Sequence, residues 1–214
     1  QRTIQEPLRR MINIHYNDMH MVSVIPDFMT QHECDHILQH SLQTMQPSKV
    51  VSDDGEGQKH KGRTGSNTWL PHNTNDVILN VAQRLSDTVR MPLENAEPFQ
   101  VVHYEVGQEY DYHWDSFDKS DESYNEKYVS QQGGQRIITA LGYLRDVPKG
   151  GETGFNRLGV NVQPKQGTVV IWYNVEPDTT KRELLSQHAG LPVLEGEKYA
   201  FNLWFRESKF GESL

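Results

Sequence analysis

From Phe99 onward the chain consists of short runs of β-branched and aromatic residues that Gly, Pro and Asp separate. Runs of this length and spacing predict short strands and favour a sandwich or barrel. One further run of this kind precedes them. The predicted strands are Met21–Ile25, Phe99–Tyr104, Tyr110–Asp115, Arg136–Leu144, Thr168–Tyr173 and Lys198–Phe205.

Two helices are expected in the amino-terminal half. Thr30 and Glu33 have the spacing of a capping box, and apolar residues then recur at helical intervals down to Pro47. These apolar residues are Cys34, Ile37, Leu38, Leu42 and Met45. A second apolar face begins near Thr74 and ends before Pro92. Its members are Val77, Ile78, Val81, Ala82, Leu85 and Val89.

Composition and charge exclude several classes of protein. The single cysteine, Cys34, permits neither an internal disulfide nor a metal cage built from thiolates. The net charge of -8 gives no reason to expect nucleic acid as a partner. No run reaches the roughly 20 apolar residues of a membrane helix, and the amino terminus has no signal-peptide pattern. We therefore expect a soluble chain with no membrane partner, and its compartment and oligomeric state stay open.

The sequence His32-Glu33-Cys34-Asp35-His36 matches the H-E-x-x-H pattern of zinc proteases. Glu33, however, is the residue that the capping box requires, and the apolar stripe of this helix leaves both histidines facing solvent. No third ligand motif follows. We therefore favour helix capping over a zinc site, with the zinc protease kept as an alternative.

A second metal pattern is His113-Trp114-Asp115 in a predicted strand. Residues two apart in a strand project to the same side, so the imidazole and the carboxylate converge while Trp114 points away. Two histidines and one carboxylate on one face of Fe(II) leave positions open for a cosubstrate and O₂. His188 is the best-placed candidate for the missing histidine.

Lys198 opens the last predicted strand, ten residues after His188. Strand parity places Lys198, Ala200, Asn202 and Trp204 on one face. If that face is buried, the lysine needs an anion, and the distal carboxylate of 2-oxoglutarate would supply one. A solvent-exposed lysine at the end of a strand is the alternative.

The order and spacing of several further motifs carry a family resemblance. They are Arg63–Trp69, Gln100–Tyr110, Gly133–Arg136, Gly150–Thr153, Pro164–Gly167, His188–Val193 and Gly196–Lys198. Over nearly all of its length the chain resembles the catalytic domain of the collagen-type prolyl 4-hydroxylases, which are Fe(II)- and 2-oxoglutarate-dependent dioxygenases. Leu191 departs from the pattern, since Cys is usual there. The segment 116–134, expected to be a lid, matches no motif.

The resemblance implies a mainly β fold with flanking helices and a double-stranded β-helix, or jelly-roll, core. It implies one domain over residues 1–214, with a helical support region at 1–95 that includes a mobile loop at 48–62, and the core at 96–208. It matches His113, Asp115 and His188 to the iron ligands. Lys198 matches the residue that binds 2-oxoglutarate, at a position where related oxygenases usually carry Arg.

By the same comparison, Tyr104, Thr139 and Tyr143 would line the cosubstrate pocket. Tyr110, Arg136 and Trp204 would lie on the peptide side of the metal, with Arg63 as a further candidate for substrate binding. Packing is the alternative role for the aromatic residues. A solvated charge is the alternative for Arg63.

The implied activity is hydroxylation of peptidyl proline with Fe(II), 2-oxoglutarate, O₂ and ascorbate, releasing succinate and CO₂. A proline-rich or collagen-like peptide would be the partner, arriving as an extended polyproline II segment. Two alternatives remain. One is a sister oxygenase acting on another peptide residue, a free amino acid or a small molecule, and the other is a non-catalytic jelly-roll binding module.

Overall fold

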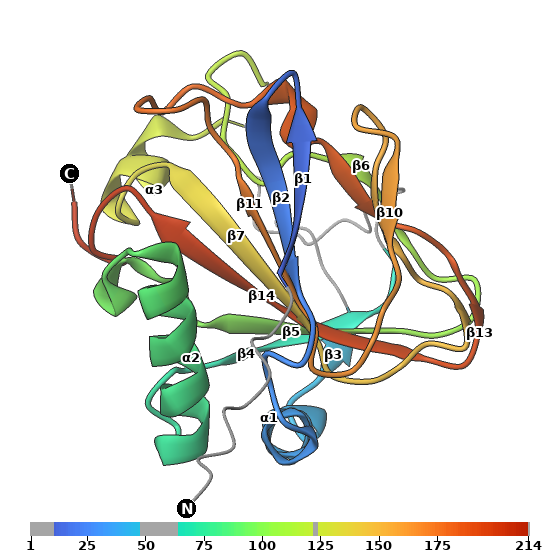
Figure 1. Ribbon diagram of the computed structural model, residues 1–214. Helices are drawn as coiled ribbons and strands as arrows, with labels where there is room; N and C mark the ends of the chain where they lie inside the picture. Colours follow the sequence, from blue (N-terminus) through green and yellow to red (C-terminus); the bar gives the residue numbers. More distant parts are fainter. Residues whose placement is uncertain (1–10, 48–63, 122–123, 214) are drawn as a thin grey trace, which may run out of the picture.

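Two antiparallel β-sheets organise the computed structural model, which describes residues 11–47, 64–121 and 124–213 (Figure 1). The larger sheet has eight strands in the order β1-β2-β11-β7-β14-β5-β4-β3. Its strands are β1 (Ile12–Tyr16), β2 (Met19–Ile25), β3 (Gln46–Pro47), β4 (Ser66–Leu70), β5 (Phe99–Tyr104), β7 (Arg136–Tyr143), β11 (Val169–Tyr173) and β14 (Lys198–Arg206). The predicted mainly β class is confirmed.

The smaller sheet has four strands in the order β10-β9-β12-β6. They are β6 (Tyr110–His113), β9 (Thr153–Phe155), β10 (Val160–Val162) and β12 (His188–Gly190). A separate pair consists of β8 (Lys149–Gly150) and β13 (Val193–Glu195). Most of these strands have three residues or fewer, which is too short to show an alternating pattern in the sequence.

Side-chain alternation in the larger sheet produces two hydrophobic layers. In β14, Phe201, Leu203 and Phe205 face a layer shared with the helices. Ala200 belongs to the other layer, which also contains Phe155, Val162 and Val193 and therefore lies between the two sheets. Strand β14 therefore contributes to both layers. Its side chains on the face of Ala200 point toward the smaller sheet.

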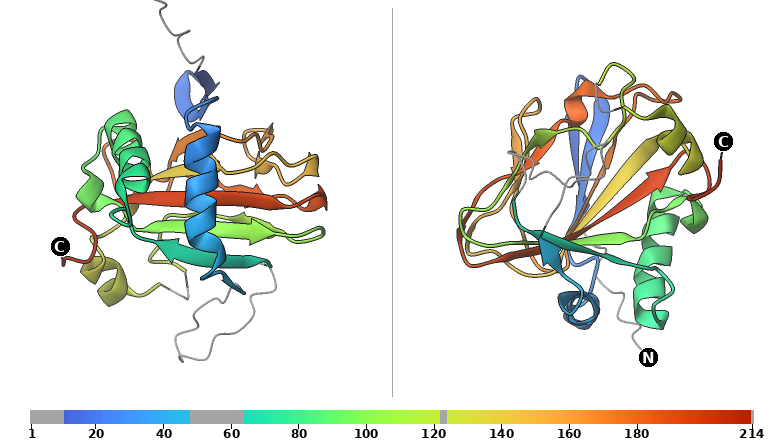
Figure 2. Two further views of the ribbon diagram at one scale, coloured as in Figure 1. Left: turned by 90° about the horizontal axis from the view of Figure 1, so that it is seen from below. Right: turned by 180° about the vertical axis from the view of Figure 1, so that it is seen from behind.

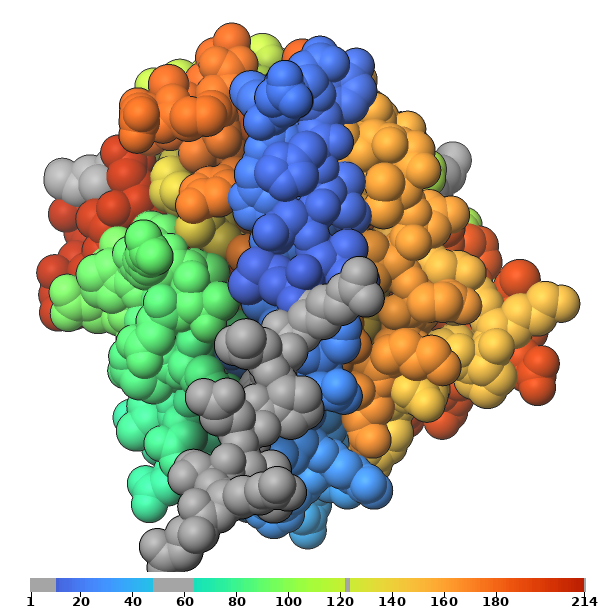
Figure 3. Space-filling model, viewed as in Figure 1, coloured from blue at the N-terminus to red at the C-terminus, as the bar shows by residue number. Residues whose placement is uncertain are grey.

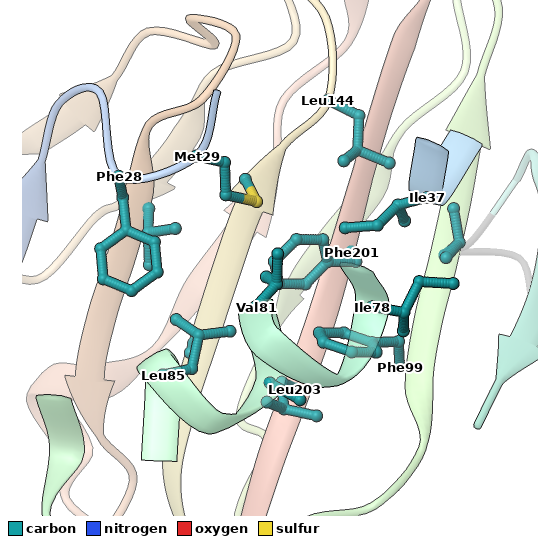
Figure 4. Packing of buried hydrophobic residues seen from close by; sticks show 14 of the residues in the cluster. Phe28, Met29, Ile37, Ile78, Val81, Leu85, Phe99, Leu144, Phe201 and Leu203 are labelled. Carbon is teal, nitrogen blue, oxygen red and sulfur yellow. The ribbon is translucent and has the colours of Figure 1, made fainter. Parts of the chain in front are cut away.

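Helices α1 (Gln31–Leu42) and α2 (Asp76–Val89) cover the outer face of the larger sheet (Figure 2). Figure 4 shows Ile78, Val81 and Leu85 of α2 directed toward the phenylalanines of the sheet. The aromatic rings of Phe99 and Phe201 meet edge to face with centroids 4.8 Å apart. Burial of each of these side chains contributes about 2 kcal/mol to the stability of the fold, which holds α2 on this face.

The ends of both helices follow from local chemistry. Thr30 and Glu33 form the predicted capping box, and Asn75 caps α2 by accepting a hydrogen bond from the Ile78 amide. The first helix ends at Leu42, five residues before the predicted end, so Met45 lies outside it. The prediction was wrong there because Gln46 and Pro47 pair with β4 instead, and the residue before a proline disfavours helix.

The amino-terminal hairpin of β1 and β2 extends the larger sheet at its edge. Figure 3 shows this hairpin at the surface. The side chains of Ile12 and Tyr16 are exposed. The region before residue 96 thus contributes strands as well as helices. In the part of the chain that the structure describes, no helix has the length and apolar character needed to cross a membrane.

Three short helical segments complete the described elements. They are the 3₁₀ turns η1 (Leu93–Asn95) and η2 (Leu184–Ser186), and α3 (Glu126–Gln131). The last of these lies within the 116–134 segment that was expected to be a lid. The predicted loop at 48–62 and the candidate residue Arg63 lie outside the described residues.

Candidate active site

The smaller sheet brings the predicted metal ligands together. His188 in β12 pairs directly with His113 in β6, so the two imidazoles project from neighbouring strands on the same side. Their ring centroids are 4.4 Å apart. Asp115 follows β6 by two residues. Strands far apart in the sequence therefore converge on one point, as the H-x-D spacing predicted for two of the three residues.

The ligand atoms of His113, Asp115 and His188 all lie within 4.8 Å of one another. The Oδ1 atom of Asp115 is 3.4 Å from Nε2 of His113 and 3.5 Å from Nε2 of His188. Among the described residues, this is the one group of three or more metal-ligating side chains that meets at such distances. A set of two imidazoles and one carboxylate suits Fe(II) and leaves coordination positions open.

The second nitrogen of each imidazole makes a backbone contact. Nδ1 of His113 lies 2.7 Å from the carbonyl of Asp111, and Nδ1 of His188 lies 2.8 Å from the carbonyl of Ser186. A carbonyl only accepts, so each Nδ1 carries the proton and each Nε2 presents its lone pair. Such outer hydrogen bonds are typical of histidine metal ligands.

The other carboxylate oxygen of Asp115 is held by two donors. Its Oδ2 accepts hydrogen bonds from Thr139 Oγ1 at 2.7 Å and from Trp204 Nε1 at 3.0 Å. Asn174 Nδ2 in turn donates to Thr139 at 2.8 Å. Oδ1 is thus left to face the two histidines.

Electrostatics in the site favour the protonation states that a metal needs. Burial and the neighbouring His188 lower the pKa of His113, while Asp115 opposes this shift. Burial alone would raise the pKa of Asp115, but the two histidines hold it well below its usual range. A neutral imidazole and an ionised carboxylate are the ligand forms that bind a divalent cation.

Lys198 lines the same cavity from the start of β14. Its side chain is buried, and burial lowers the pKa of its ammonium to about 8. The Nζ atom lies 5.9 Å from the ring centre of Tyr104 and 5.7 Å from that of Tyr143. No carboxylate of the described chain forms an ion pair with it. The charge of Glu152 opposes this lowering of the pKa without forming an ion pair, so the buried ammonium favours a further anion beside it.

A cavity of about 170 Å³ joins the three metal-ligating residues to Lys198. Ala200, Asn202 and Trp204 line it together with Lys198, as strand parity predicted for β14. Trp114 lines it as well, although parity placed this side chain on the far side. The prediction failed for Trp114 because β6 ends at His113 and the alternation stops with it.

The residues expected around the cosubstrate occupy different positions. Tyr104 lines the cavity. Thr139 lies behind Asp115 as its hydrogen-bond donor rather than in the wall. Tyr143 is fully buried, and its hydroxyl lies 2.5 Å from Oγ1 of Thr153, which itself lines the cavity. Thr139 and Tyr143 thus support residues that line the cavity.

The residues expected on the peptide side form one connected group. The ring of Tyr110 stacks on His113, with centroids 3.7 Å apart. The guanidinium carbon of Arg136 lies 3.7 Å from the ring centre of Trp204. All three side chains, Tyr110, Arg136 and Trp204, line the cavity.

Glu97 holds Arg136 in this position and was absent from the sequence-based predictions. Its carboxylate accepts from Arg136 Nε at 2.7 Å and Nη2 at 3.0 Å, and from Arg206 Nε at 2.6 Å. Although burial raises the pKa of Glu97, the two arginines lower it below its usual value. No short sequence motif predicts this arrangement, because Glu97, Arg136 and Arg206 lie far apart in the sequence.

The H-E-x-x-H residues of α1 are engaged elsewhere. Both carboxylate oxygens of Glu33 accept hydrogen bonds of 2.9 Å from Arg84, and one also accepts from the Thr30 amide. His32 is exposed, and its ring centroid is 5.8 Å from that of His36. Glu33 therefore stabilises the helix rather than acting as a general base.

Fold and site together are typical of a metal-dependent enzyme: a triad in which Asp115 and His188 are buried and His113 is half-buried lies on a β-sheet core. A family model described as the 2OG-Fe(II) oxygenase superfamily matches residues 99–206. Prolyl 4-hydroxylase 5 of Arabidopsis thaliana is 34% identical over 207 residues, which cover 87% of this chain and 68% of that protein. Prolyl 4-hydroxylase 2 of the same plant is 33% identical over 213 residues, covering 89% and 69%.

A solved structure with a similar fold supports this family assignment. The viral collagen prolyl hydroxylase of Paramecium Bursaria Chlorella virus-1, in its 2OG complex, superposes with a TM-score of 0.68 at 28% identity, covering 86% of this chain and 94% of that one. The chain belongs to the 2OG-Fe(II) oxygenase superfamily. Membership confirms the jelly-roll fold, Fe(II) and 2-oxoglutarate as cofactor and cosubstrate, and the predicted class of 2-oxoglutarate-dependent dioxygenase.

Proposed function

We propose that this enzyme hydroxylates C4 of peptidyl proline and converts 2-oxoglutarate and O₂ to succinate and CO₂. One observation carries the proposal. A single cavity contains the His113, Asp115 and His188 cluster, the buried ammonium of Lys198, and a wall of Tyr110, Arg136 and Trp204. The relatives named prolyl 4-hydroxylase support the substrate.

The donor set of the cavity fits Fe(II). Nε2 of His113, Oδ1 of Asp115 and Nε2 of His188 would hold the ion, since these atoms face one another while the remaining polar atoms are hydrogen-bonded elsewhere. When bound, Fe(II) supplies the redox chemistry that activates O₂ and oxidises an unactivated C–H bond. The protein supplies ligand geometry and keeps bulk water away.

Lys198 would bind the distal carboxylate of 2-oxoglutarate. Its ammonium is buried, and the ion pair would restore the charged form that burial disfavours. Thr153 adds a hydroxyl to the same wall, where its Oγ1 is fixed by Tyr143. The distance between Lys198 and the histidine cluster would then be spanned by the cosubstrate itself, with its 2-oxo acid end at the metal.

A peptide would lie against Tyr110, Arg136 and Trp204. Flat aromatic rings suit a polyproline II segment, which is already extended and loses little entropy on binding. Arg136 donates to Glu97 through Nε and Nη2, so its Nη1 would donate to a peptide carbonyl. We propose that the peptide is proline-rich or collagen-like. Arg63 remains a predicted contact outside the described residues.

Ascorbate belongs to the proposal as a reductant that would keep the iron in its ferrous state. Its need is tested by omission: turnover of the purified enzyme should decline with time without ascorbate and persist with it. A rate that is independent of ascorbate would remove this part of the proposal and leave the remainder unaffected.

Mass spectrometry of Pro-containing peptides tests the substrate most directly. Peptides incubated with Fe(II), 2-oxoglutarate and ascorbate should gain one oxygen atom on proline, and matched peptides with alanine in place of proline should not. Turnover of a free amino acid or a small molecule instead would favour the sister oxygenase. Absence of any succinate formation would favour the non-catalytic binding module.

A further inference from the structure

The carboxylate ligand Asp115 lies where regular structure no longer fixes the backbone. His113 and His188 are held by cross-strand pairing between β6 and β12. Asp115 comes two residues after β6 ends, in an irregular segment. Ladder hydrogen bonds therefore do not determine where its Cα lies, and other contacts must do so.

Arg182 supplies such contacts to both chain neighbours of Asp115. Its Nη2 donates to the Ser116 carbonyl at 2.8 Å, and its Nε lies 3.2 Å from the Ser116 hydroxyl. On the other side, the guanidinium carbon lies 4.9 Å from the ring centre of Trp114. The planar side chain of Arg182 thus contacts both Trp114, which precedes Asp115, and Ser116, which follows it.

Arg182 is itself held firmly. Its side chain is 11% exposed and pairs with Asp121 at 2.8 Å and with Asp118 at 3.6 Å. The guanidinium fork is rigid and stays charged, so it can fix several acceptors at once in a way that an ammonium cannot. These acceptors all lie in the segment that begins at Asp115, whereas Arg182 precedes η2 and β12, which carries His188.

Gln135 holds the same segment one residue further along. Its side chain accepts from the Phe117 amide at 2.8 Å and donates to the Phe117 carbonyl at 2.8 Å. It also donates to the Thr180 carbonyl at 3.2 Å, two residues before Arg182. Both polar side chains therefore tie the backbone after Asp115 to the stretch that leads to His188.

We propose that Arg182 is a positioning residue for the iron site: by fixing Trp114 and Ser116, it sets where the Asp115 carboxylate stands relative to the two histidines. The inference rests on the metal-binding role of the triad given above. It does not depend on proline as the substrate. Outer residues that orient metal ligands typically contribute about 10- to 100-fold to metal affinity.

The test is a metal titration of the full chain. Anaerobic Fe(II) is added to the apo protein with 2-oxoglutarate present, and the charge-transfer absorbance of the ternary complex gives the dissociation constant. Arg182→Gln should weaken Fe(II) binding about tenfold. Arg182→Lys, which keeps the charge and loses the fork, should fall between this variant and the parent. Lys181→Gln is the matched control, because Lys181 is exposed and pairs only with Glu176 among the described residues.

A purely structural role predicts a different pattern. In that case Arg182→Gln would lower the thermal midpoint of the apo protein while its Fe(II) dissociation constant stayed within about twofold of the parent value, and this result would overturn the proposal. Saturating Fe(II) should restore kcat in Arg182→Gln and leave only the iron requirement raised. If Arg182→Gln does not fold, Arg182→Lys and Ser116→Ala decide, and unchanged Fe(II) affinity in both overturns it equally.

Discussion

The indole Nε1 of Trp204 donates a 3.0 Å hydrogen bond to Oδ2 of Asp115. The same ring lies 3.7 Å below the guanidinium carbon of Arg136. Trp204 thus joins the proposed peptide side of the cavity to a metal ligand. Oδ2 also accepts a hydrogen bond from Thr139, so Oδ1 is the carboxylate oxygen that faces the histidines.

Replacing Trp204 by Phe should keep the stacking surface for Arg136 and remove the donor to Asp115. We expect Fe(II) affinity to fall by about tenfold, since outer hydrogen bonds of metal ligands contribute on this scale. An Fe(II) titration with 2-oxoglutarate measures the change. Trp69→Phe serves as the control, because Trp69 packs near Trp204 with ring centroids 6.1 Å apart and makes no hydrogen bond to the carboxylate. Equal losses in both variants would contradict the account.

Glu97→Gln should destabilise the fold by about 3 kcal/mol, because it leaves the buried Arg206 and the half-buried Arg136 without their counter-charge. Arg206 is fully buried, and Arg136 and Arg206 share this one carboxylate. Chemical denaturation measures the free energy of unfolding. The comparison is Glu33→Gln, whose partner Arg84 is 35% exposed and whose capping role glutamine can retain, so its cost should be about 1 kcal/mol. A smaller loss in Glu97→Gln than in Glu33→Gln would show that the buried network adds nothing to stability.

The affinity for 2-oxoglutarate should decline as pH rises through about 8. Burial lowers the pKa of Lys198 to about 8 in the free protein, and only the protonated ammonium pairs with a carboxylate. Above that value each further pH unit should cost about tenfold in affinity, because a proton must be taken up on binding. Titrations with 2-oxoglutarate between about pH 7 and about pH 10 measure this. Lys198→Arg should flatten the profile, since a guanidinium stays charged. A flat profile in the parent protein would contradict the lowered pKa of Lys198.

The double variant His32→Ala, His36→Ala should keep the iron requirement and the rate of succinate formation of the parent protein. The helix carries these residues on the outer side of the larger sheet, and Glu33 is occupied by Arg84. Succinate formation is measured after a chelator has removed metal from the protein and either Fe(II) or Zn(II) has been added back. Only Fe(II) should restore it. Recovery with Zn(II) that depends on His32 and His36 would revive the zinc-protease alternative.

Long elements with a clear period could be predicted from the sequence. The predicted strand Phe99–Tyr104 has its observed ends, because four of its six residues are strand formers and it lies between Pro98 and Glu105. The H-x-D spacing and His188 led to the cluster that the structure assembles. Short strands such as Thr153–Phe155 have no detectable period, and pairing rather than propensity makes them strands.

The supporting residues could not be predicted, because they depend on how distant segments meet. Glu97 and Arg206 come together only through the packing of η1 beside β14. Arg182 reaches Ser116 across 66 residues of sequence. No local pattern marks such residues. The sequence therefore predicts which side chains would bind the metal, and the structure shows which residues position those side chains.

Anaerobic Fe(II) titration in the presence of 2-oxoglutarate tests the central claim most directly. The account predicts a charge-transfer band that saturates at one iron per chain in the parent protein. It predicts no such band in His113→Ala or His188→Ala, each of which removes one of the three facing ligand atoms. A band of parent intensity in either variant, or succinate formation that continues in His113→Ala, would contradict the assignment of His113, Asp115 and His188 as the iron ligands.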